Sequence, residues 1–135
     1  MPPGIRIRRE ILDWLSAEAL RSSLEECCGL LAGVGGVITA AFPARNALAS
    51  PVAFEIAPED LFAIFRSLRA GGLELLGIYH SHPAGPETPS PTDIERADYP
   101  DVAYFILSPR ADEQARIRSF SIRDGRVAEL EIERV

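Results

Sequence analysis

The sequence predicts a single α/β domain, residues 1–135, in which a mixed β-sheet is covered by helices. A chain of 135 residues is long enough for one compact domain and too short for two ordinary ones. With 47% hydrophobic and 25% charged residues, its composition is that of a globular protein with a buried core. Helical periodicity alternates with short apolar segments and glycine turns, a pattern typical of helices packed on a sheet.

The first predicted elements are a helix and a β-hairpin. From Arg9 to about Leu24, apolar residues recur at three- and four-residue steps with charged residues between them, which predicts an amphipathic helix. The apolar segments Glu26–Gly33 and Val37–Phe42 are separated by Gly35-Gly36, which predicts two strands joined by a tight turn.

The middle of the chain is predicted to contain a short strand, Ala53–Ile56, and then a second helix. Pro58 suits the first turn of a helix, the acidic residues after it favour a helix N-terminus, and Gly71-Gly72 is a typical helix end. The predicted core face of this helix consists of Leu61, Phe62, Ile64, Phe65 and Leu68.

The last part of the chain is predicted to be mainly extended. Leu73–Tyr79 is an apolar strand that continues into His80-Ser81-His82 and a proline-rich loop. A short helix is predicted to begin at Ser90-Pro91-Thr92-Asp93. Three further strands are predicted over Val102–Leu107, Ala115–Ile122 and Val127–Ile132, the last two joined at Asp124-Gly125.

Charge and cysteine usage exclude several classes of function. Twenty acidic and fourteen basic residues give a net charge of −6, the opposite of what a protein that binds nucleic acid carries. No apolar stretch is long enough for a membrane span, and no signal peptide is visible, so we expect no membrane partner. A disulfide between the adjacent Cys27 and Cys28 would be strained, which favours a reducing, cytoplasmic setting. Arg66, Arg69 and Arg110 are interpreted as surface charge, and no pattern indicates an oligomeric state.

The two histidines of the chain, His80 and His82, mark a candidate metal site. They follow the Leu73–Tyr79 strand, and side chains two apart on a strand share one face, about 6.5 Å apart at Cα. Two such imidazoles are typical ligands of a catalytic zinc ion. Asp93 is the candidate third ligand, because Ser90 would cap the short helix and leave Asp93 in its first turn, facing the strand end.

Two further residues are candidates for a role in hydrolysis. Three protein ligands leave a tetrahedral zinc ion one open position for a water molecule, whose pKa falls to roughly 7. A hydrolase also needs a proton carrier that is not a ligand, and Glu26 is the candidate, whereas Glu25 beside it is assigned to solvent. The Ser90 hydroxyl is suited to stabilise an oxyanion, a contribution of roughly 3 kcal/mol when preorganised. Ser90 and Asp93 also fit a capping box, which is the structural explanation of the same spacing.

These residues resemble the pattern of the JAMM metalloproteases, the catalytic MPN-plus branch of the MPN domains. That pattern is an upstream Glu, His-x-His, a seven-residue gap and Ser-x-x-Asp, here Glu26, His80-Ser81-His82, Pro83 to Pro89, and Ser90-Pro91-Thr92-Asp93. The segment Glu-Cys-Cys-Gly-Leu-Leu-Ala-Gly also looks like the family's first-strand signature. The resemblance implies a cytidine-deaminase-like α/β fold and one zinc ion per chain, held by His80, His82 and Asp93. It also implies that Glu26 is the general acid/base and that Ser90 stabilises the oxyanion.

The resemblance also implies a class of substrate. Members of the family cleave peptide or isopeptide bonds that follow the Gly-Gly tail of ubiquitin or of ubiquitin-like sulfur carriers. The chain resembles the short prokaryotic members, some of which release cysteine from a carrier-protein adduct during cysteine biosynthesis. The expected partner is therefore a ubiquitin-like or sulfur-carrier protein with a C-terminal Gly-Gly, whose tail would lie along the predicted strand edge at Ala53–Ile56.

Three other interpretations compete with a JAMM hydrolase. A non-catalytic MPN-type scaffold that only binds partners would be preferred if any ligand were missing. A cupin-like site would use His80, His82 and Glu87, but cupins are all-β and need a further histidine. A Cys28–His80 nucleophilic dyad would have no third group to orient it. Failure of the native protein to bind zinc would favour the scaffold.

Overall fold

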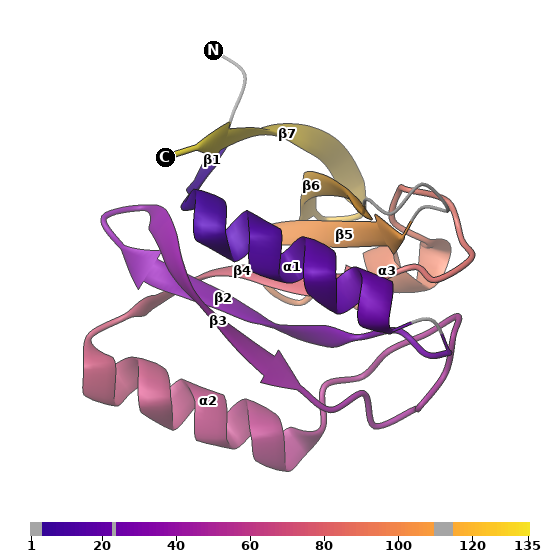
Figure 1. Ribbon diagram of the computed structural model, residues 1–135, viewed down its shortest axis with the longest axis horizontal. Helices are drawn as coiled ribbons and strands as arrows, with labels where there is room; N and C mark the ends of the chain where they lie inside the picture. The colour runs from indigo at the N-terminus through magenta and orange to yellow at the C-terminus, as the bar shows by residue number, and fades with distance from the viewer. Residues whose placement is uncertain (1–3, 23, 110–114) are drawn as a thin grey trace.

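The computed structural model describes residues 4–22, 24–109 and 115–135, and the predicted surface residue Arg110 lies outside them. Within these residues, the chain forms seven strands and three helices (Figure 1). The strands are β1 (Gly4–Ile7), β2 (Cys28–Val34), β3 (Val37–Ala44), β4 (Glu74–Ser81), β5 (Ala103–Pro109), β6 (Ala115–Arg123) and β7 (Arg126–Arg134). The helices are α1 (Arg9–Arg21), α2 (Pro58–Gly71) and α3 (Pro91–Glu95).

The strands form one mixed sheet that closes into a barrel. Hydrogen bonding runs in the order β1-β3-β2-β4-β5-β6-β7, and β1 also pairs with β7 in parallel. The pairs β1–β3 and β4–β5 are parallel as well, and the other neighbours are antiparallel. The predicted α/β class with a mixed sheet is therefore confirmed, and its closure is a feature that the sequence did not predict.

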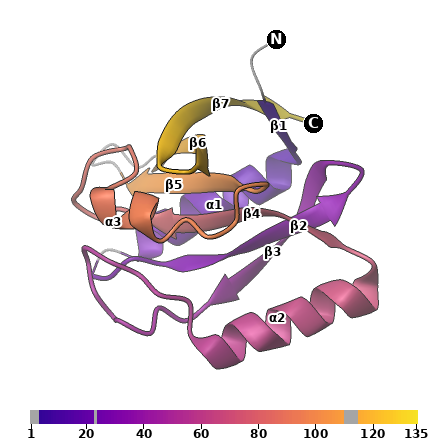
Figure 2. The same ribbon diagram turned by 180° about the vertical axis from the view of Figure 1, so that it is seen from behind.

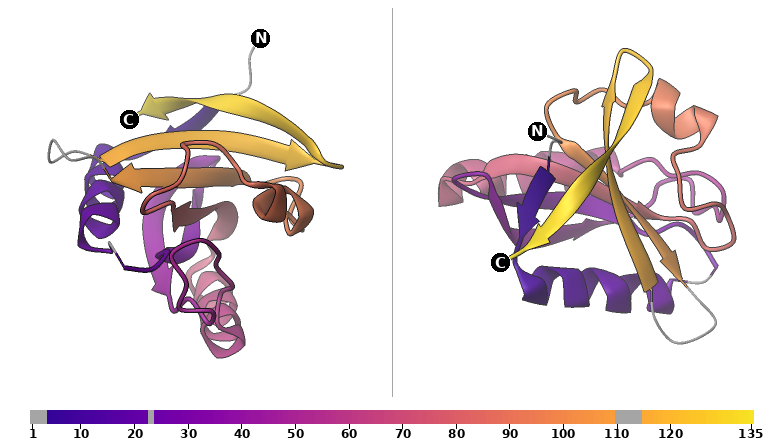
Figure 3. Two further views of the ribbon diagram at one scale, coloured as in Figure 1. Left: turned by 90° about the vertical axis from the view of Figure 1, so that its right-hand side faces the viewer. Right: turned by 90° about the horizontal axis from the view of Figure 1, so that it is seen from above.

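The two longer helices cover different parts of the sheet. The apolar face of α1 packs on β4 and β5, where Tyr79 and Phe105 are fully buried. The apolar face of α2, with Ile64 and Leu68, packs against Leu30 of β2. Figures 1 and 3 show the two helices apart from each other, α1 across the middle of the sheet and α2 beyond β3. The start of α2 lies near the end of β4 that carries the histidines, because Pro58 and Leu61 line the same cavity as His80.

The predicted glycine turns are confirmed. Gly35 and Gly36, between β2 and β3, have φ values of 64° and 77°, and Asp124 and Gly125, between β6 and β7, have 50° and 76°. Two consecutive residues with positive φ are typical of a type I′ turn, whose twist matches that of antiparallel strands. Gly72 has a φ of 66° and ends α2, as predicted.

Two of the sequence predictions about strands differ from the structure. β1 is missing from the prediction, because the four residues Gly4–Ile7 are too few to show a period and pair only with distant parts of the chain. The predicted strand Ala53–Ile56 is wrong, since only Ile56 forms a single bridge, to Asn46. The Asn46 side chain contacts the Ala53 carbonyl and the Glu55 N–H instead of a neighbouring strand.

Two apolar residues that were assigned to helix faces lie in solvent. Phe62, predicted on the core face of α2, is 65% exposed, because the buried stripe of that helix runs along Ile64 and Leu68. The first helix ends at Arg21 rather than near Leu24, and Leu24 is 86% exposed. Both errors concern the edge of an amphipathic pattern, where three- and four-residue spacing alone does not separate core from surface.

The register of the sheet places Glu26 next to the histidines. Cys28 of β2 lies opposite His80 of β4 in an antiparallel ladder. The pairing continues beyond β2, because the Ser81 N–H donates to the Cys27 carbonyl at 3.0 Å and the Cys27 N–H donates to the Ser81 hydroxyl at 2.9 Å. Glu26, the next residue in this direction, therefore reaches the level of the residue that follows Ser81.

Candidate active site

The candidate site lies at the end of β4, where α3 and the segment before β2 meet it. His80 is the second-last residue of β4, and His82 directly follows the strand. Ser90 is the N-cap of α3 and Asp93 lies in its first turn. In Figures 1 and 2, α3 lies beside this end of the sheet. The structure thus brings together His80, His82, Asp93, Ser90 and, through the register of β2 and β4, Glu26.

Three potential ligand atoms face one another at this point. His80 Nε2 lies 3.0 Å from His82 Nε2 and 3.1 Å from Asp93 Oδ2, and His82 Nε2 lies 3.0 Å from the same oxygen. Ligand atoms about 2.0–2.1 Å from a tetrahedral zinc ion are about 3.3 Å apart, so one ion fits this triangle with little adjustment. Two imidazoles and a carboxylate are also a known donor set for a catalytic ion with an open position. These three side chains could therefore hold one divalent metal ion.

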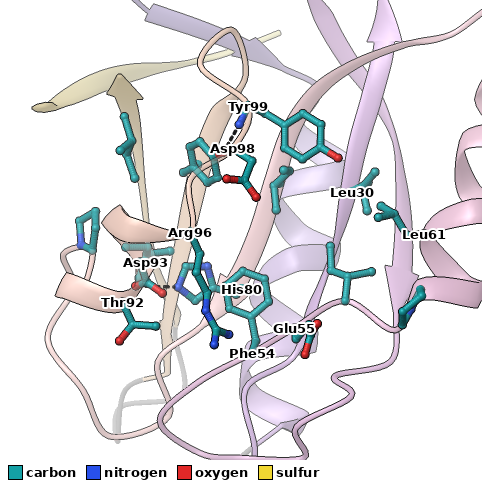
Figure 4. A pocket seen from close by; sticks show the side chains of 17 residues that line it. Leu30, Phe54, Glu55, Leu61, His80, Thr92, Asp93, Arg96, Asp98 and Tyr99 are labelled. Carbon is teal, nitrogen blue, oxygen red and sulfur yellow. Dashed lines mark hydrogen bonds and ion pairs between the residues drawn. The ribbon is translucent and has the colours of Figure 1, made fainter. Parts of the chain in front are cut away.

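Neighbouring groups orient both imidazoles. His82 Nδ1 donates to the Pro86 carbonyl at 2.7 Å, so in the neutral ring Nε2 carries the lone pair that faces the triangle. The Phe54 ring stacks on the His80 ring, with centroids 4.3 Å apart and an interplanar angle of 18° (Figure 4). His80 is 1% exposed, and this burial lowers its pKa from the ordinary 6.5. A neutral imidazole is the form that binds a metal ion.

A capping box holds Asp93 in position. The Asp93 N–H donates to Ser90 Oγ at 3.0 Å, and the Ser90 N–H donates to Asp93 Oδ2 at 2.8 Å. Burial alone would raise the pKa of Asp93, but hydrogen bonds with His80 and His82 lower it well below its usual range. Burial would likewise lower the pKa of His82, but its contacts with Asp93 and a backbone carbonyl raise it. The cap that starts α3 therefore also aims the carboxylate at the two histidines.

Glu26 is a buried carboxyl group with an unpaired oxygen. The residue is 2% exposed, and its Oε1 atom has no hydrogen-bond partner among the described residues. Ligand atoms of Glu26, His80 and His82 all lie within 4.8 Å of one another. Burial raises the pKa of Glu26 from 4.5 to about 7. A carboxyl group that titrates near neutral pH beside a set of metal ligands is suited to take up and release a proton.

A cavity of about 520 Å³ opens beside His80. Its walls are largely apolar and include Ile78 of β4, Ile106 of β5 and the segment that carries Phe54 and Ile56. Figure 4 shows Phe54 in front of His80 at one end of this cavity, with Asp93 next to the imidazole. An extended peptide therefore has room beside the potential metal ligands.

The structure does not support the Cys28–His80 dyad or the cupin-like site. The Cys28 thiol contacts the Ala44 carbonyl at 3.7 Å, and burial raises its pKa to about 12, so it is not an activated nucleophile. Glu87, the third residue of the cupin-like set, forms an ion pair with Arg116 at 3.0 Å. The two long helices are also incompatible with an all-β cupin.

Two residues of the site were missed by the sequence prediction. Phe54 was assigned to a strand whose edge would receive the substrate tail, and its stacking on His80 was not predicted. Asn46 was placed in a loop, although its side chain is 5% exposed and donates to the Glu26 carbonyl at 3.0 Å. The only available signal for Asn46 was that it is the single asparagine of the chain. No local spacing connects either residue to the histidines.

Comparisons with known proteins identify the family of the chain. Residues 8–123 match the family model of prokaryotic homologues of the JAB domain. The desampylase of Haloferax volcanii is 44% identical over 87 residues, which are 62% of this chain and 63% of that protein, somewhat less than two thirds of its length. The CysO-cysteine peptidase of Mycobacterium tuberculosis is 33% identical over 91% of this chain and 86% of that protein.

A solved structure is similar to this chain over nearly its full length. The solution structure of protein DSY2949 from Desulfitobacterium hafniense has a TM-score of 0.86 and 30% identity, covering 97% of this chain and 92% of that one. This likeness confirms the fold class, and the family match confirms the resemblance found in the sequence. The chain belongs to the prokaryotic homologues of the JAB domain, the short prokaryotic type of the JAMM family.

Proposed function

We propose that this chain is a zinc-dependent peptidase that cleaves the peptide or isopeptide bond after the C-terminal Gly-Gly of a ubiquitin-like or sulfur-carrier protein. The observation that carries this proposal is the triangle of His80 Nε2, His82 Nε2 and Asp93 Oδ2, with sides of 3.0–3.1 Å, beside the buried carboxyl group of Glu26. A scaffold that only binds partners has no need for a buried unpaired carboxyl group, which costs stability. We also propose that each chain binds one zinc ion.

Each polar group of the site has a role in this reaction. His80, His82 and Asp93 would hold zinc, which supplies Lewis-acid activation of water and of the scissile carbonyl. Glu26 takes the proton from the attacking water and passes it to the leaving amine, since its pKa of about 7 suits both steps near neutral pH. The Ser90 oxygen accepts from the Asp93 N–H, so its proton is free to donate to the carbonyl oxygen as negative charge develops there.

The substrate class is supported by the relatives and by the walls of the cavity. Relatives are named for the cleavage of small protein modifiers and carriers, as the desampylase and the CysO-cysteine peptidase are. Backbone groups of Glu55 and Ala57 bond to residues 45–47, at 2.8 Å and 3.0 Å. In the bridge between Asn46 and Ile56, the backbone groups of Ile56 therefore point away from residues 45–47, and both Phe54 and Ile56 line the cavity. An extended Gly-Gly tail would pair with this edge and reach His80.

We also propose that the enzyme works in the cytoplasm, on the evidence of its thiols. Cys27 and Cys28 are both free thiols, and an oxidising compartment would favour their oxidation to disulfides. Among the described residues, no helix is long and apolar enough to cross a membrane.

Intact-mass analysis of a Gly-Gly-ended sulfur carrier with one extra C-terminal cysteine tests the activity. The carrier is incubated with zinc-loaded protein, with protein plus a chelator, and with Glu26→Gln. Glu25→Gln is the matched control, because Glu25 is the exposed neighbour of Glu26. We expect the terminal cysteine to be lost with wild type and Glu25→Gln, and retained with the chelator and with Glu26→Gln.

The same assay separates the remaining outcomes. Zinc content, measured by elemental analysis, should be one ion per chain. A protein that binds no zinc and cleaves nothing would instead be a scaffold. A zinc-loaded protein that cleaves neither this carrier nor a carrier linked to a lysine side chain would refute the proposed substrate class.

A further inference from the structure

The side chain of Asn46 is buried and uses all of its hydrogen-bonding groups. Its Nδ2 donates to the carbonyl oxygens of Glu26 and Ala53, both at 3.0 Å. Its Oδ1 accepts from the backbone N–H groups of Leu48 at 3.0 Å and Glu55 at 3.1 Å. A carboxamide has two N–H donors and two oxygen lone pairs, so this side chain is saturated by backbone groups.

These hydrogen bonds join two segments that each carry part of the proposed active site. On one side, the Glu26 carbonyl accepts from Asn46 while the Glu26 N–H donates to the Ser50 carbonyl at 2.7 Å. The backbone of the proposed base is thus held from both directions. On the other side lies Ala53–Ile56, which carries the Phe54 ring stacked on His80.

Among the described residues, no hydrogen bond joins Glu26 directly to Ala53–Ile56. Residues 47–55 form no strand, and Ile56 makes one isolated bridge, to Asn46 itself. The carboxamide therefore replaces the strand that would otherwise satisfy the Ala53 carbonyl and the Glu55 N–H. Without it, these half-buried and exposed backbone groups would lose their protein partners, and the two segments would be free to shift relative to each other.

We propose that Asn46 is a positioning residue that fixes the Glu26 backbone and the Ala53–Ile56 segment relative to each other. The segment that receives the substrate tail then places the scissile bond within reach of the general base. This inference rests on the proposed function, because it concerns the distance between its base and its tail-binding edge. A misplacement of the base relative to the substrate by about 1 Å can lower the rate about 100-fold. The hydrogen bonds of Asn46 to both segments are therefore important for catalysis.

Two substitutions separate the donor and acceptor halves of this side chain. Asn46→Asp keeps an oxygen that can accept from Leu48 and Glu55, but it loses the NH₂ group that donates to Glu26 and Ala53. Asn46→Ala loses both halves. Leu12→Ala is the control for general destabilisation, because Leu12 is a buried residue of α1, in the core beneath that helix.

Steady-state kinetics on the carrier with the extra cysteine give the first readout. For zinc-loaded Asn46→Asp we expect kcat/KM to fall by about 10- to 100-fold, with a lower kcat and a higher KM. Zinc content should stay at the wild-type level, since the ligands come from β4 and α3. Leu12→Ala should keep wild-type kcat and KM once corrected for its folded fraction. If Asn46→Asp lost kcat only in proportion to its folded fraction, with KM unchanged, the positioning role would be wrong.

Amide hydrogen exchange gives a readout that does not depend on cleavage. We expect faster exchange of the Glu26 amide in both Asn46 variants, because its bond to the Ser50 carbonyl opens more often once the Glu26 carbonyl has lost Asn46. Exchange at Leu48 and Glu55 should rise in Asn46→Ala and stay slow in Asn46→Asp. Unchanged protection of Glu26 in both variants would overturn the inference. If wild type cleaved neither substrate, the proposed function would fail, and the exchange pattern would still decide whether Asn46 holds the two segments together.

Discussion

Replacing Glu26 with glutamine should change how the stability of the metal-free protein depends on pH. Burial raises the pKa of Glu26 to about 7 in the folded chain, against 4.5 for an ordinary glutamic acid. The folded state therefore holds this proton more tightly than the unfolded state does. The stability that this contributes is fully present below pH 4.5 and is lost as the pH rises through 7.

The size of the effect follows from the two pKa values. A group with pKa values of about 4.5 unfolded and 7 folded makes the folded state lose about 2–3 kcal/mol between pH 5 and pH 8. Glutamine does not titrate, so Glu26→Gln lacks this loss. The variant should thus gain about 2–3 kcal/mol relative to wild type over that range, whatever constant difference the amide group itself introduces.

Urea unfolding in the presence of a chelator measures this difference. Trp14, the single tryptophan, packs edge-to-face on Tyr79 with ring centroids 5.9 Å apart, so its fluorescence should report unfolding. Wild type, Glu26→Gln and the exposed control Glu25→Gln are compared at pH 5 and pH 8. If the free energies of unfolding of wild type and Glu26→Gln changed in parallel between pH 5 and pH 8, burial would not raise the pKa of Glu26 as argued.

Three further substitutions test other parts of the structure. Phe54→Ala removes the ring stacked on His80, and we expect it to bind zinc about 10-fold more weakly, as measured by competition with a coloured chelator. Unchanged zinc affinity would mean that the stacking does not orient His80. Gly29→Ala should cost about 1–3 kcal/mol in urea unfolding, because its Cβ would lie 2.5 Å from the Phe42 carbonyl and from Tyr79; a neutral result would contradict that packing. Ser90→Ala should lower kcat about 100-fold or more at constant zinc content, and a small loss would restrict Ser90 to capping α3.

The candidate metal ligands could be predicted because their arrangement is local. His80 lies on β4 and His82 directly follows it, where the His82 N–H still donates to the Leu107 carbonyl of β5 at 2.9 Å, so strand spacing places both imidazoles on one face. Ser90 and Asp93 are three residues apart at a helix start, where a reciprocal cap fixes the carboxylate. In both pairs, one turn or one strand step sets the geometry, so the pattern in the sequence is sufficient.

The positions of Glu26, Phe54 and Asn46 depend on contacts between distant segments. Glu26 reaches the histidines only because Cys28 pairs with His80 across two strands, and such a register has no local signal. Phe54 and Asn46 belong to a segment that follows no strand or helix period, since side-chain hydrogen bonds hold it.

The sequence by itself determined the helices, the strands other than β1, and the side chains that could bind a metal ion, because helix and strand periods and caps act over a few residues. Only the tertiary structure decided that β1 closes the sheet between β3 and β7, and that Glu26 is buried beside the histidines with a pKa of about 7. Both features arise from the pairing of strands far apart in the chain. The stability of such pairing depends on the whole core and not on any short segment.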